Sequence, residues 1–255
     1  MSMSSRHLFA CLVPFLLPWS ALHADDFQSG EVKIHYTVQG SGTPVILIHG
    51  LHSSAQMNWA LPGTTAALAD HHKVIALDLR GHGASDKPED DASYGVPMVE
   101  DVIALMDHLE IKRAVWVGYS MGGMIALKGA VLHPDRVSGL VLGGMGWLKD
   151  GSVLQDFWAS TGTKRSGLGG ASAKACMRGM AKLAVTEAQV KSLKMPAAII
   201  IGDKDPVKKL YVEPLEVIRP DWPVTTIPGA GHIVCVMKPE FREAVVKAVD
   251  GFGKN

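Results

Sequence analysis

The sequence predicts an α/β fold: a mostly parallel central sheet flanked by helices, with a small helical cap insertion. Three observations support this prediction. Short apolar runs rich in β-branched residues recur along the chain, as strands buried on both faces require. Helical stretches separate these runs, which is typical of parallel sheets with right-handed crossovers. The 255 residues, 47% of them apolar, have the size and composition of one globular domain.

The elements are predicted in chain order. The first strand, Glu31–Val38, alternates in polarity, as a half-exposed strand at the edge of a sheet would. The remaining strands are apolar runs at 44–48, 73–77, 114–117, 139–142, 197–201 and 224–227. Helices are predicted at 64–69, 98–109, 121–132 and 239–252. In the second of these helices, the apolar residues lie along one face.

One stretch interrupts the alternation of strands and helices. From about residue 146 to residue 194 no strand-like run occurs, and two or three helical patterns are found instead. The last of them opens with a capping box, Thr186 to Gln189. Because the stretch lies between two core strands, we expect a small cap above the sheet.

Residues 1–24 have the features of an export signal. Arg6 and His7 precede the apolar run Leu8–Leu17, and a small-residue exit ends at Ala24. The run is shorter than the roughly 20 residues that span a bilayer. We therefore expect cleavage after Ala24, an exported (periplasmic or secreted) protein with its folded domain in 25–255, and no stable membrane insertion. An uncleaved anchor is the alternative.

Loss of this leader would leave two cysteines, Cys176 and Cys235. In an exported protein they can form one disulfide, or both can be small buried apolar residues. The sequence leaves this choice open.

Charge and motif content argue against several classes of partner. The 25 basic residues balance 25 acidic ones, so no net field attracts nucleic acid or an anionic membrane. The histidines do not cluster with carboxylates at ligand spacing, so we expect no metal. Bulky side chains within Gly118–Gly123 do not suit a pyrophosphate cradle, and no organic cofactor is expected.

The strongest chemical signal is Gly118-Tyr119-Ser120-Met121-Gly122, between a predicted buried strand and a predicted helix. A sharp strand-to-helix turn strains the backbone of the central residue, and the flanking glycines relieve the crowding. The start of the helix favours developing negative charge. The motif therefore predicts that Ser120 is a nucleophile.

A serine hydroxyl needs a base to take its proton. His232 follows the last predicted strand within a run of small residues, which predicts that it is this base. Asp205, in the turn after strand 197–201, is predicted to orient the imidazole, whereas Asp203 is expected to end the strand or cap the turn. The chain order Ser, Asp, His differs from the chymotrypsin and subtilisin orders.

Two backbone N–H groups are predicted to hold the oxyanion of a tetrahedral intermediate. They belong to Leu51, after the strand 44–48, and to Met121, after the serine. Apolar residues near these positions are candidates for the substrate pocket: Met57, Trp59, Trp147, Ile233 and Val234, with Leu51 and Met121 themselves. Each is an equally good core residue.

From about Glu31 to Phe252 the chain resembles members of the α/β-hydrolase-fold superfamily. The matching features are His49-Gly50, Asp78–Ser85, Gly118–Gly123, Gly202–Pro206 and Gly231-His232. The resemblance implies that the segment Asp78–Ser85 supports the nucleophile turn, so Arg80 and His82 receive no catalytic role. The predicted cap is shorter and richer in glycine than the lids of many relatives, which weakens any inference about substrate.

These observations predict a serine hydrolase, foremost a carboxylesterase that forms an acyl-enzyme with small to medium apolar esters. A serine nucleophile excludes the aspartate-dependent dehalogenase and epoxide-hydrolase mechanisms of related proteins. Two enzymatic alternatives stay open: a cofactor-free perhydrolase or haloperoxidase, and a C–C bond hydrolase of aromatic ring-cleavage products. A ligand-binding receptor that keeps the triad is the alternative of another class.

Overall fold

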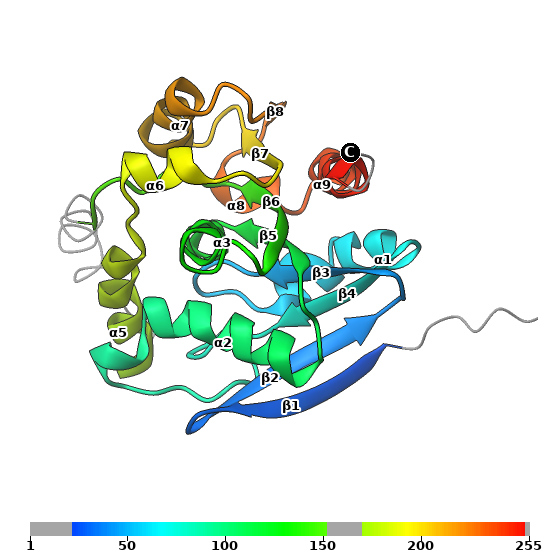
Figure 1. Cartoon of the computed structure of the whole chain (residues 1–255), viewed down its shortest axis with the longest axis vertical. Coiled ribbons are helices and arrows are strands. Elements are labelled where there is room, and N and C mark those ends of the chain that lie inside the picture. Colours follow the sequence, from blue (N-terminus) through cyan, green and yellow to red (C-terminus); the bar gives the residue numbers. More distant parts are fainter. Residues whose placement is uncertain (1–21, 152–169, 253–255) are drawn as a thin grey trace, which may run out of the picture.

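The structure is a computed structural model that describes residues 22–151 and 170–252. Most of the predicted leader lies outside these residues. Within them, eight strands form one sheet in the order β1-β2-β4-β3-β5-β6-β7-β8. The strands from β4 to β8 run parallel, whereas β1 and β2 pair antiparallel with their neighbours. The predicted mostly parallel α/β fold is confirmed (Figure 1).

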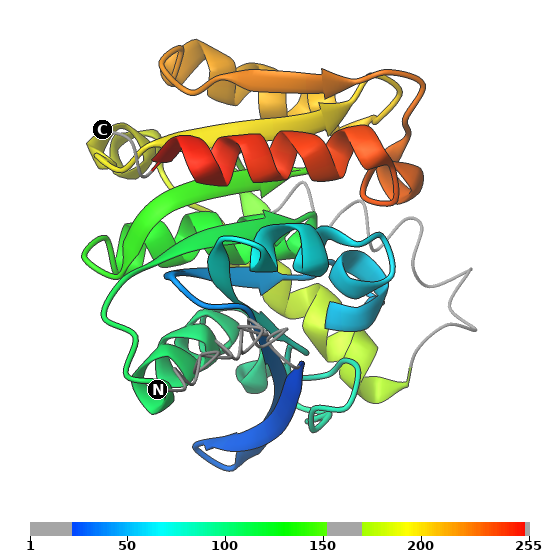
Figure 2. The same cartoon turned by 90° about the vertical axis from the view of Figure 1, so that its right-hand side faces the viewer.

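Seven of the eight strands in the described residues, β2 to β8, occupy segments that were predicted as strands. The bounds of these eight strands are β1 (His23–Ser29), β2 (Val32–Gln39), β3 (Thr43–Ile48), β4 (His72–Leu77), β5 (Ala114–Tyr119), β6 (Val137–Gly143), β7 (Ala197–Gly202) and β8 (Val224–Ile227). The residues of β5 and β7 are all buried, as central strands of a parallel sheet require. Figure 2 shows the parallel strands ending at the same edge of the sheet.

The edge of the sheet differs from the prediction. The strand predicted at Glu31–Val38 corresponds to β2, which is the second strand, and the edge strand is β1. β1 begins at His23, one residue before Ala24, the predicted end of the leader. Its sequence is polar and only Phe27 is buried, so no apolar pattern marks it; pairing with β2 makes it a strand.

Helices cover both faces of the sheet (Figure 1). On one face, a cluster of buried hydrophobic side chains includes residues of α2 (Val96–His108), α3 (Met121–Leu132) and α7 (Glu213–Ile218). The cluster on the other includes residues of α9 (Pro239–Phe252), and α1 (Thr64–Ala69) packs beside α9. Outside the cap, single turns form η1 (Gln56–Ala60), η2 (Asp91–Ser93), η4 (Lys208–Val212) and α8 (His232–Cys235).

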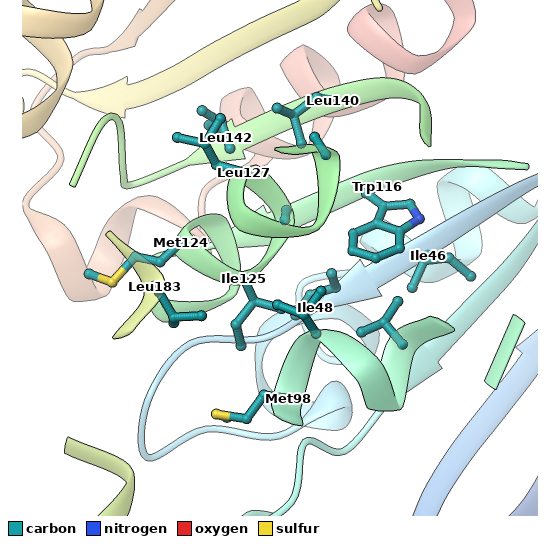
Figure 3. Packing of buried hydrophobic residues seen from close by; sticks show 14 of the residues in the cluster. Ile46, Ile48, Met98, Trp116, Met124, Ile125, Leu127, Leu140, Leu142 and Leu183 are labelled. Carbon is teal, nitrogen blue, oxygen red and sulfur yellow. The ribbon is translucent and has the colours of Figure 1, made fainter. Parts of the chain in front are cut away.

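Helix α3, which follows Ser120, packs closely on the sheet. Figure 3 shows Trp116 of β5, Ile46 of β3 and Leu140 of β6 in the apolar layer that α3 covers. A Cβ on Gly129 would lie 2.2 Å from the Trp116 ring, so only glycine allows the helix this approach. The tight layer gives the turn before α3 a rigid base.

The described part of the cap is helical. It contains α5 (Ala171–Gly179), η3 (Met180–Leu183) and α6 (Glu187–Ser192), and the predicted capping box of Thr186 and Gln189 is present. Arg178 of α5 donates to both carboxylate oxygens of Asp91 at 2.7 and 2.5 Å. The Cys176 thiol lies 3.6 Å from the sulfur of Met121. The cap helix therefore contacts the residue that follows Ser120.

The segment Asp78–Ser85 braces neighbouring loops. The Asp78 carboxylate accepts hydrogen bonds from the N–H groups of Ala55 and Ala84 at 2.8 and 2.9 Å. Arg80 donates twice to the buried carboxylate of Asp101 in α2, at 2.6 Å each. These contacts tie the segment to the loop after β3 and to α2, and none of them is with the nucleophile turn that the resemblance implies the segment supports.

Candidate active site

Ser120 lies between β5 and α3 in a strained backbone conformation, with φ 52° and ψ −116°. Such a conformation costs a non-glycine residue on the order of 1–3 kcal/mol. Surrounding hydrogen bonds offset that cost. The Ser120 N–H donates to the Gly143 carbonyl at 2.8 Å, and the Ser120 carbonyl accepts from the N–H groups of Gly123 and Met124 at 2.8 and 3.2 Å.

The glycines on either side of the serine are required by close approach of backbone. A Cβ on Gly118 would lie 2.1 Å from the Gly122 carbonyl oxygen. A Cβ on Gly122 would lie 2.1 Å from the carbonyl oxygen of Ile48, the last residue of β3. The turn therefore folds tightly on itself and on the neighbouring strand.

Sheet register brings the predicted oxyanion loop beside this turn. Ile48 of β3 pairs with Gly118 of β5, so the segments that follow these residues leave the sheet side by side. A Cβ on Gly50 would lie 3.3 Å from the Cβ of Ser120. The N–H groups of Leu51 and Met121 thus belong to adjoining segments, and within the described residues neither donates a backbone hydrogen bond.

The structure brings Ser120, His232 and Asp205 into one hydrogen-bonded chain. The Ser120 Oγ lies 2.8 Å from Nε2 of His232, and Nδ1 of His232 lies 2.8 Å from Oδ2 of Asp205. A carboxylate only accepts hydrogen bonds, so Nδ1 carries the proton and Nε2 is left to accept one from the serine. The geometry suits a general base that removes the serine proton.

Asp205 is held in place by its own turn. It follows β7, and its side chain is fully buried. Its second oxygen, Oδ1, accepts a hydrogen bond from the N–H of Val207 at 2.9 Å. This leaves Oδ2 directed at the imidazole.

Asp203, in the same turn, contacts a neighbouring loop. Its Oδ1 accepts a hydrogen bond from the N–H of Ala230, in the loop that carries His232, at 3.0 Å. This loop also passes close to β7, since a Cβ on Gly202 would lie 2.1 Å from the Ala230 carbonyl. Asp203 therefore fixes the loop and does not contact the imidazole in this structure.

The pocket candidates separate into exposed and buried residues. Met57, Ile233 and Val234 are exposed. Trp59 is buried in the core with Val45 and Leu47, and Trp147 is buried with its indole N–H donating to the Val185 carbonyl. The two tryptophans therefore pack as core residues, a distinction that apolar character alone cannot make.

Both remaining cysteines are free and buried. Cys176 lies in the core cluster on the α2 and α3 face, and Cys235 in the cluster on the α9 face. Burial raises the pKa of Cys176 to about 12 and that of Cys235 to about 11, so both stay protonated near neutral pH. They do not form the disulfide that the sequence left open.

Sequence reasoning missed two residues that border the site. The side-chain oxygen of Asn58 accepts a hydrogen bond from the Gly50 N–H at 2.8 Å. The hydroxyl of Tyr119 donates to the carbonyl oxygen of His232. The middle positions of the serine motif vary freely, and an asparagine in a short helical turn carries no signal, so neither role could be found in the sequence.

Comparisons with known proteins agree with this architecture. Residues 43–161 match the family model of the α/β hydrolase fold. The chain is 42% identical over 122 residues to the dihydrolipoyllysine-residue acetyltransferase component of the acetoin cleaving system of Pseudomonas putida, covering 47% of this chain and 32% of that protein. It is 43% identical over 108 residues to 2-hydroxymuconate semialdehyde hydrolase of Pseudomonas sp. (strain CF600), covering 41% and 37%. The match thus spans about a third of the length of these curated relatives.

A solved structure covers more of the chain. A membrane phospholipase A, described as a bacterial virulence factor, superposes with a TM-score of 0.73 at 25% identity over 92% of this chain and 87% of that one. The chain has the α/β-hydrolase fold, and the family model supports its assignment to the α/β-hydrolase superfamily, as its sequence resemblance indicated.

Proposed function

We propose that this protein is a serine hydrolase that cleaves small to medium apolar carboxylic esters through an acyl-enzyme. The observation that carries the proposal is the hydrogen-bonded chain from Ser120 through His232 to the buried Asp205. Membership of a superfamily rich in hydrolases supports it.

The proposed reaction follows from the geometry. His232 takes the hydroxyl proton as the Ser120 oxygen attacks the acyl carbon, and Asp205 stabilises the imidazolium that forms. The N–H groups of Leu51 and Met121 hold the oxyanion, where each donor contributes about 3 kcal/mol to the barrier reduction. The imidazolium then protonates the leaving alcohol. In the second half, His232 takes a proton from water as the water oxygen attacks the acyl carbon, and it returns that proton to the Ser120 oxygen as the acyl–oxygen bond breaks and the acid leaves.

The proposal is tested with p-nitrophenyl esters from acetate to palmitate. We expect activity highest on short and medium chains, and a fall of at least about 10³-fold in Ser120→Ala. A Ser138→Ala variant, changed at a half-buried serine of β6, is the matched control and should keep its activity. Undiminished turnover in Ser120→Ala would overturn the mechanism.

A C–C bond hydrolase is the second candidate, favoured by the similarity to 2-hydroxymuconate semialdehyde hydrolase over 108 residues. Such an enzyme would use the same serine on a ketonic carbon. Decay of the visible absorbance of a ring-cleavage dienoate, with simple esters turned over poorly, would favour it. Halogenation of a dye with acetate and peroxide would instead favour the perhydrolase alternative. Release of one equivalent of product from an ester, followed by almost no further turnover, would favour a receptor.

We also propose that the protein is exported and that its leader is removed after Ala24. In the described residues, no helix combines the length and apolar character needed to cross a membrane. N-terminal sequencing of the protein recovered from outside the cytoplasm tests this proposal. A chain that begins at Asp25 supports it, and an intact Met1 in the membrane fraction supports the uncleaved anchor.

A further inference from the structure

Tyr119 lies next to Ser120 in the chain, and its hydroxyl contacts His232, the middle residue of the triad. Its hydroxyl donates a hydrogen bond to the backbone carbonyl oxygen of His232, across a separation of 113 residues. His232 begins α8, a single turn of four residues. Such a short helix has few internal hydrogen bonds to hold its first residue in place.

The sheet has a slot that fits the tyrosine ring. Gly143 ends the neighbouring strand β6, and Gly144 follows it. A Cβ on Gly144 would lie 2.7 Å from the ring and 3.0 Å from the hydroxyl oxygen, and one on Gly143 would lie 3.0 Å from the ring edge. The two glycines therefore leave space that Tyr119 fills on its way to His232.

Aromatic contacts fix the ring within this slot. Tyr119 is 3% exposed and packs edge-on against Phe241 of α9, with ring centroids 5.4 Å apart. Its ring also lies 5.8 Å from the imidazole of His232. A ring held on several sides loses little further freedom when its hydroxyl binds a carbonyl, so this hydrogen bond keeps the carbonyl at one position.

The hydroxyl stays a donor over the whole working range of pH. Burial, followed by the nearby Cys235 and Asp205, raises the pKa of Tyr119 above its ordinary value. The backbone N–H of Val236 opposes this shift.

We propose that Tyr119 is a positioning residue: it holds the backbone of His232 so that the imidazole stays between Asp205 and Ser120. The inference rests on the proposed function, since it assigns His232 the role of base. The two ring-nitrogen contacts of 2.8 Å hold the imidazole from its side chain, and Tyr119 holds the same residue from its backbone.

The test is Tyr119→Phe, which keeps the ring and removes only the hydroxyl. We expect kcat on p-nitrophenyl esters to fall about 10-fold with KM nearly unchanged, because a displaced base slows proton transfer without altering substrate binding. Labelling of Ser120 by a fluorophosphonate should slow to the same extent. The low-field proton resonance of His232 Nδ1 should weaken or broaden.

Tyr94→Phe is the matched control. Tyr94 is fully buried, and its hydroxyl donates to the Pro88 carbonyl at 2.7 Å and lies 2.5 Å from the Ser172 hydroxyl, so the variant also loses a hydroxyl-to-carbonyl bond. We expect it to lower the melting temperature while kcat and the His232 resonance stay as in the wild type. An equal loss of kcat in both variants, or none in Tyr119→Phe, would overturn the inference.

The outcomes separate this inference from the proposed function. Full activity in Ser120→Ala would contradict the proposed function, whereas the His232 resonance would still report whether Tyr119 holds the imidazole. Conversely, an inactive Ser120→Ala together with wild-type kinetics and an unchanged resonance in Tyr119→Phe would leave the function standing and remove the role of Tyr119.

Discussion

The Nδ1 atom of His49 donates a 2.7 Å hydrogen bond to the carbonyl oxygen of Gly50, the next residue in the chain. Its Nε2 accepts a hydrogen bond from the N–H of Leu79 at 3.0 Å, so the proton resides on Nδ1. In a trans peptide, the carbonyl and the following N–H point in opposite directions. His49 therefore holds the Leu51 N–H in one orientation, directed away from the imidazole.

Replacing His49 with Phe should impair both catalysis and stability. The Gly50–Leu51 peptide would lose its anchor, and we expect kcat to fall at least about 10-fold, toward the 10²–10³ typical of a lost oxyanion donor. The buried Leu79 N–H would lose its acceptor at a cost of about 1–3 kcal/mol, measured by urea unfolding.

A matched control for His49 lies in the same loop. His52 is exposed and has a φ of 58°, which asparagine tolerates well. His52→Asn should therefore keep kcat and stability close to those of the wild type. Unchanged kcat in His49→Phe would show that the imidazole is not required to orient the Gly50–Leu51 peptide group.

Asp205 and Asp203 should differ sharply when each is changed to asparagine. Asp205→Asn removes the charge that orients and stabilises the imidazole, and a fall in kcat of about 10³- to 10⁴-fold is expected. Asp203→Asn weakens only the contact with the Ala230 N–H, so kcat should fall less than about 10-fold, the measure of a modest positioning effect. Steady-state kinetics of the two purified variants measures this difference in kcat. Equal losses would mean that the two carboxylates share the role.

Gly122→Ala should prevent the nucleophile turn from folding correctly. The added Cβ would lie 2.1 Å from the Ile48 carbonyl oxygen, so the turn or β3 must move. We expect little soluble protein, or a markedly lower melting temperature and no labelling of Ser120 by fluorophosphonate.

Gly251→Ala in α9 is the control for this glycine substitution. No atom lies within 4 Å of an added Cβ at Gly251. Alanine favours a helix over glycine by up to about 1 kcal/mol, so the variant should be at least as stable as the wild type. A Gly122→Ala variant with wild-type melting and activity would contradict the tight turn described above.

The protein should lose stability as the pH falls from neutral. Burial, together with the neighbouring His82, lowers the pKa of His49 from 6.5 to about 3, and burial also lowers that of His82. Below pH 6.5 the unfolded chain takes up protons on these histidines that the folded protein does not. The free energy of unfolding is therefore highest above pH 6.5, where these histidines are neutral in both states, and it declines as the pH falls toward 3. Each histidine contributes a slope of up to about 1.4 kcal/mol per pH unit.

Urea unfolding between about pH 7 and about pH 5 measures this slope. His82→Gln removes one of the two histidines and should flatten the slope by up to half. An unchanged slope in this variant would assign the acid sensitivity to other groups.

Much of the fold could be predicted because its signals are local. Strands β3, β5 and β7 are buried on both faces and therefore read as unbroken apolar runs. The glycines at 118 and 122 mark a turn that tolerates no Cβ. β1 escaped prediction because its residues are mostly exposed, and its pairing with β2 rather than its composition makes it a strand.

Only part of the candidate site could be predicted from the sequence. Asp205 could be preferred to Asp203 because it lies further into the turn, but the two carboxylates separate by contact: one reaches His232 and the other Ala230. Trp59 and Ile233 looked alike as apolar residues near motifs. Burial places Trp59 in the core and leaves Ile233 83% exposed.

The sequence by itself determined which residues could form a strained nucleophile turn, a base and an orienting acid, since those depend on side-chain chemistry and on backbone preferences within a few residues. Only the tertiary structure decided that Tyr119 meets the His232 carbonyl and that His49 holds Gly50 while binding Leu79. These contacts join segments that leave different strands. They depend on the order and register of the sheet, to which burial of the whole core contributes and which no local pattern encodes.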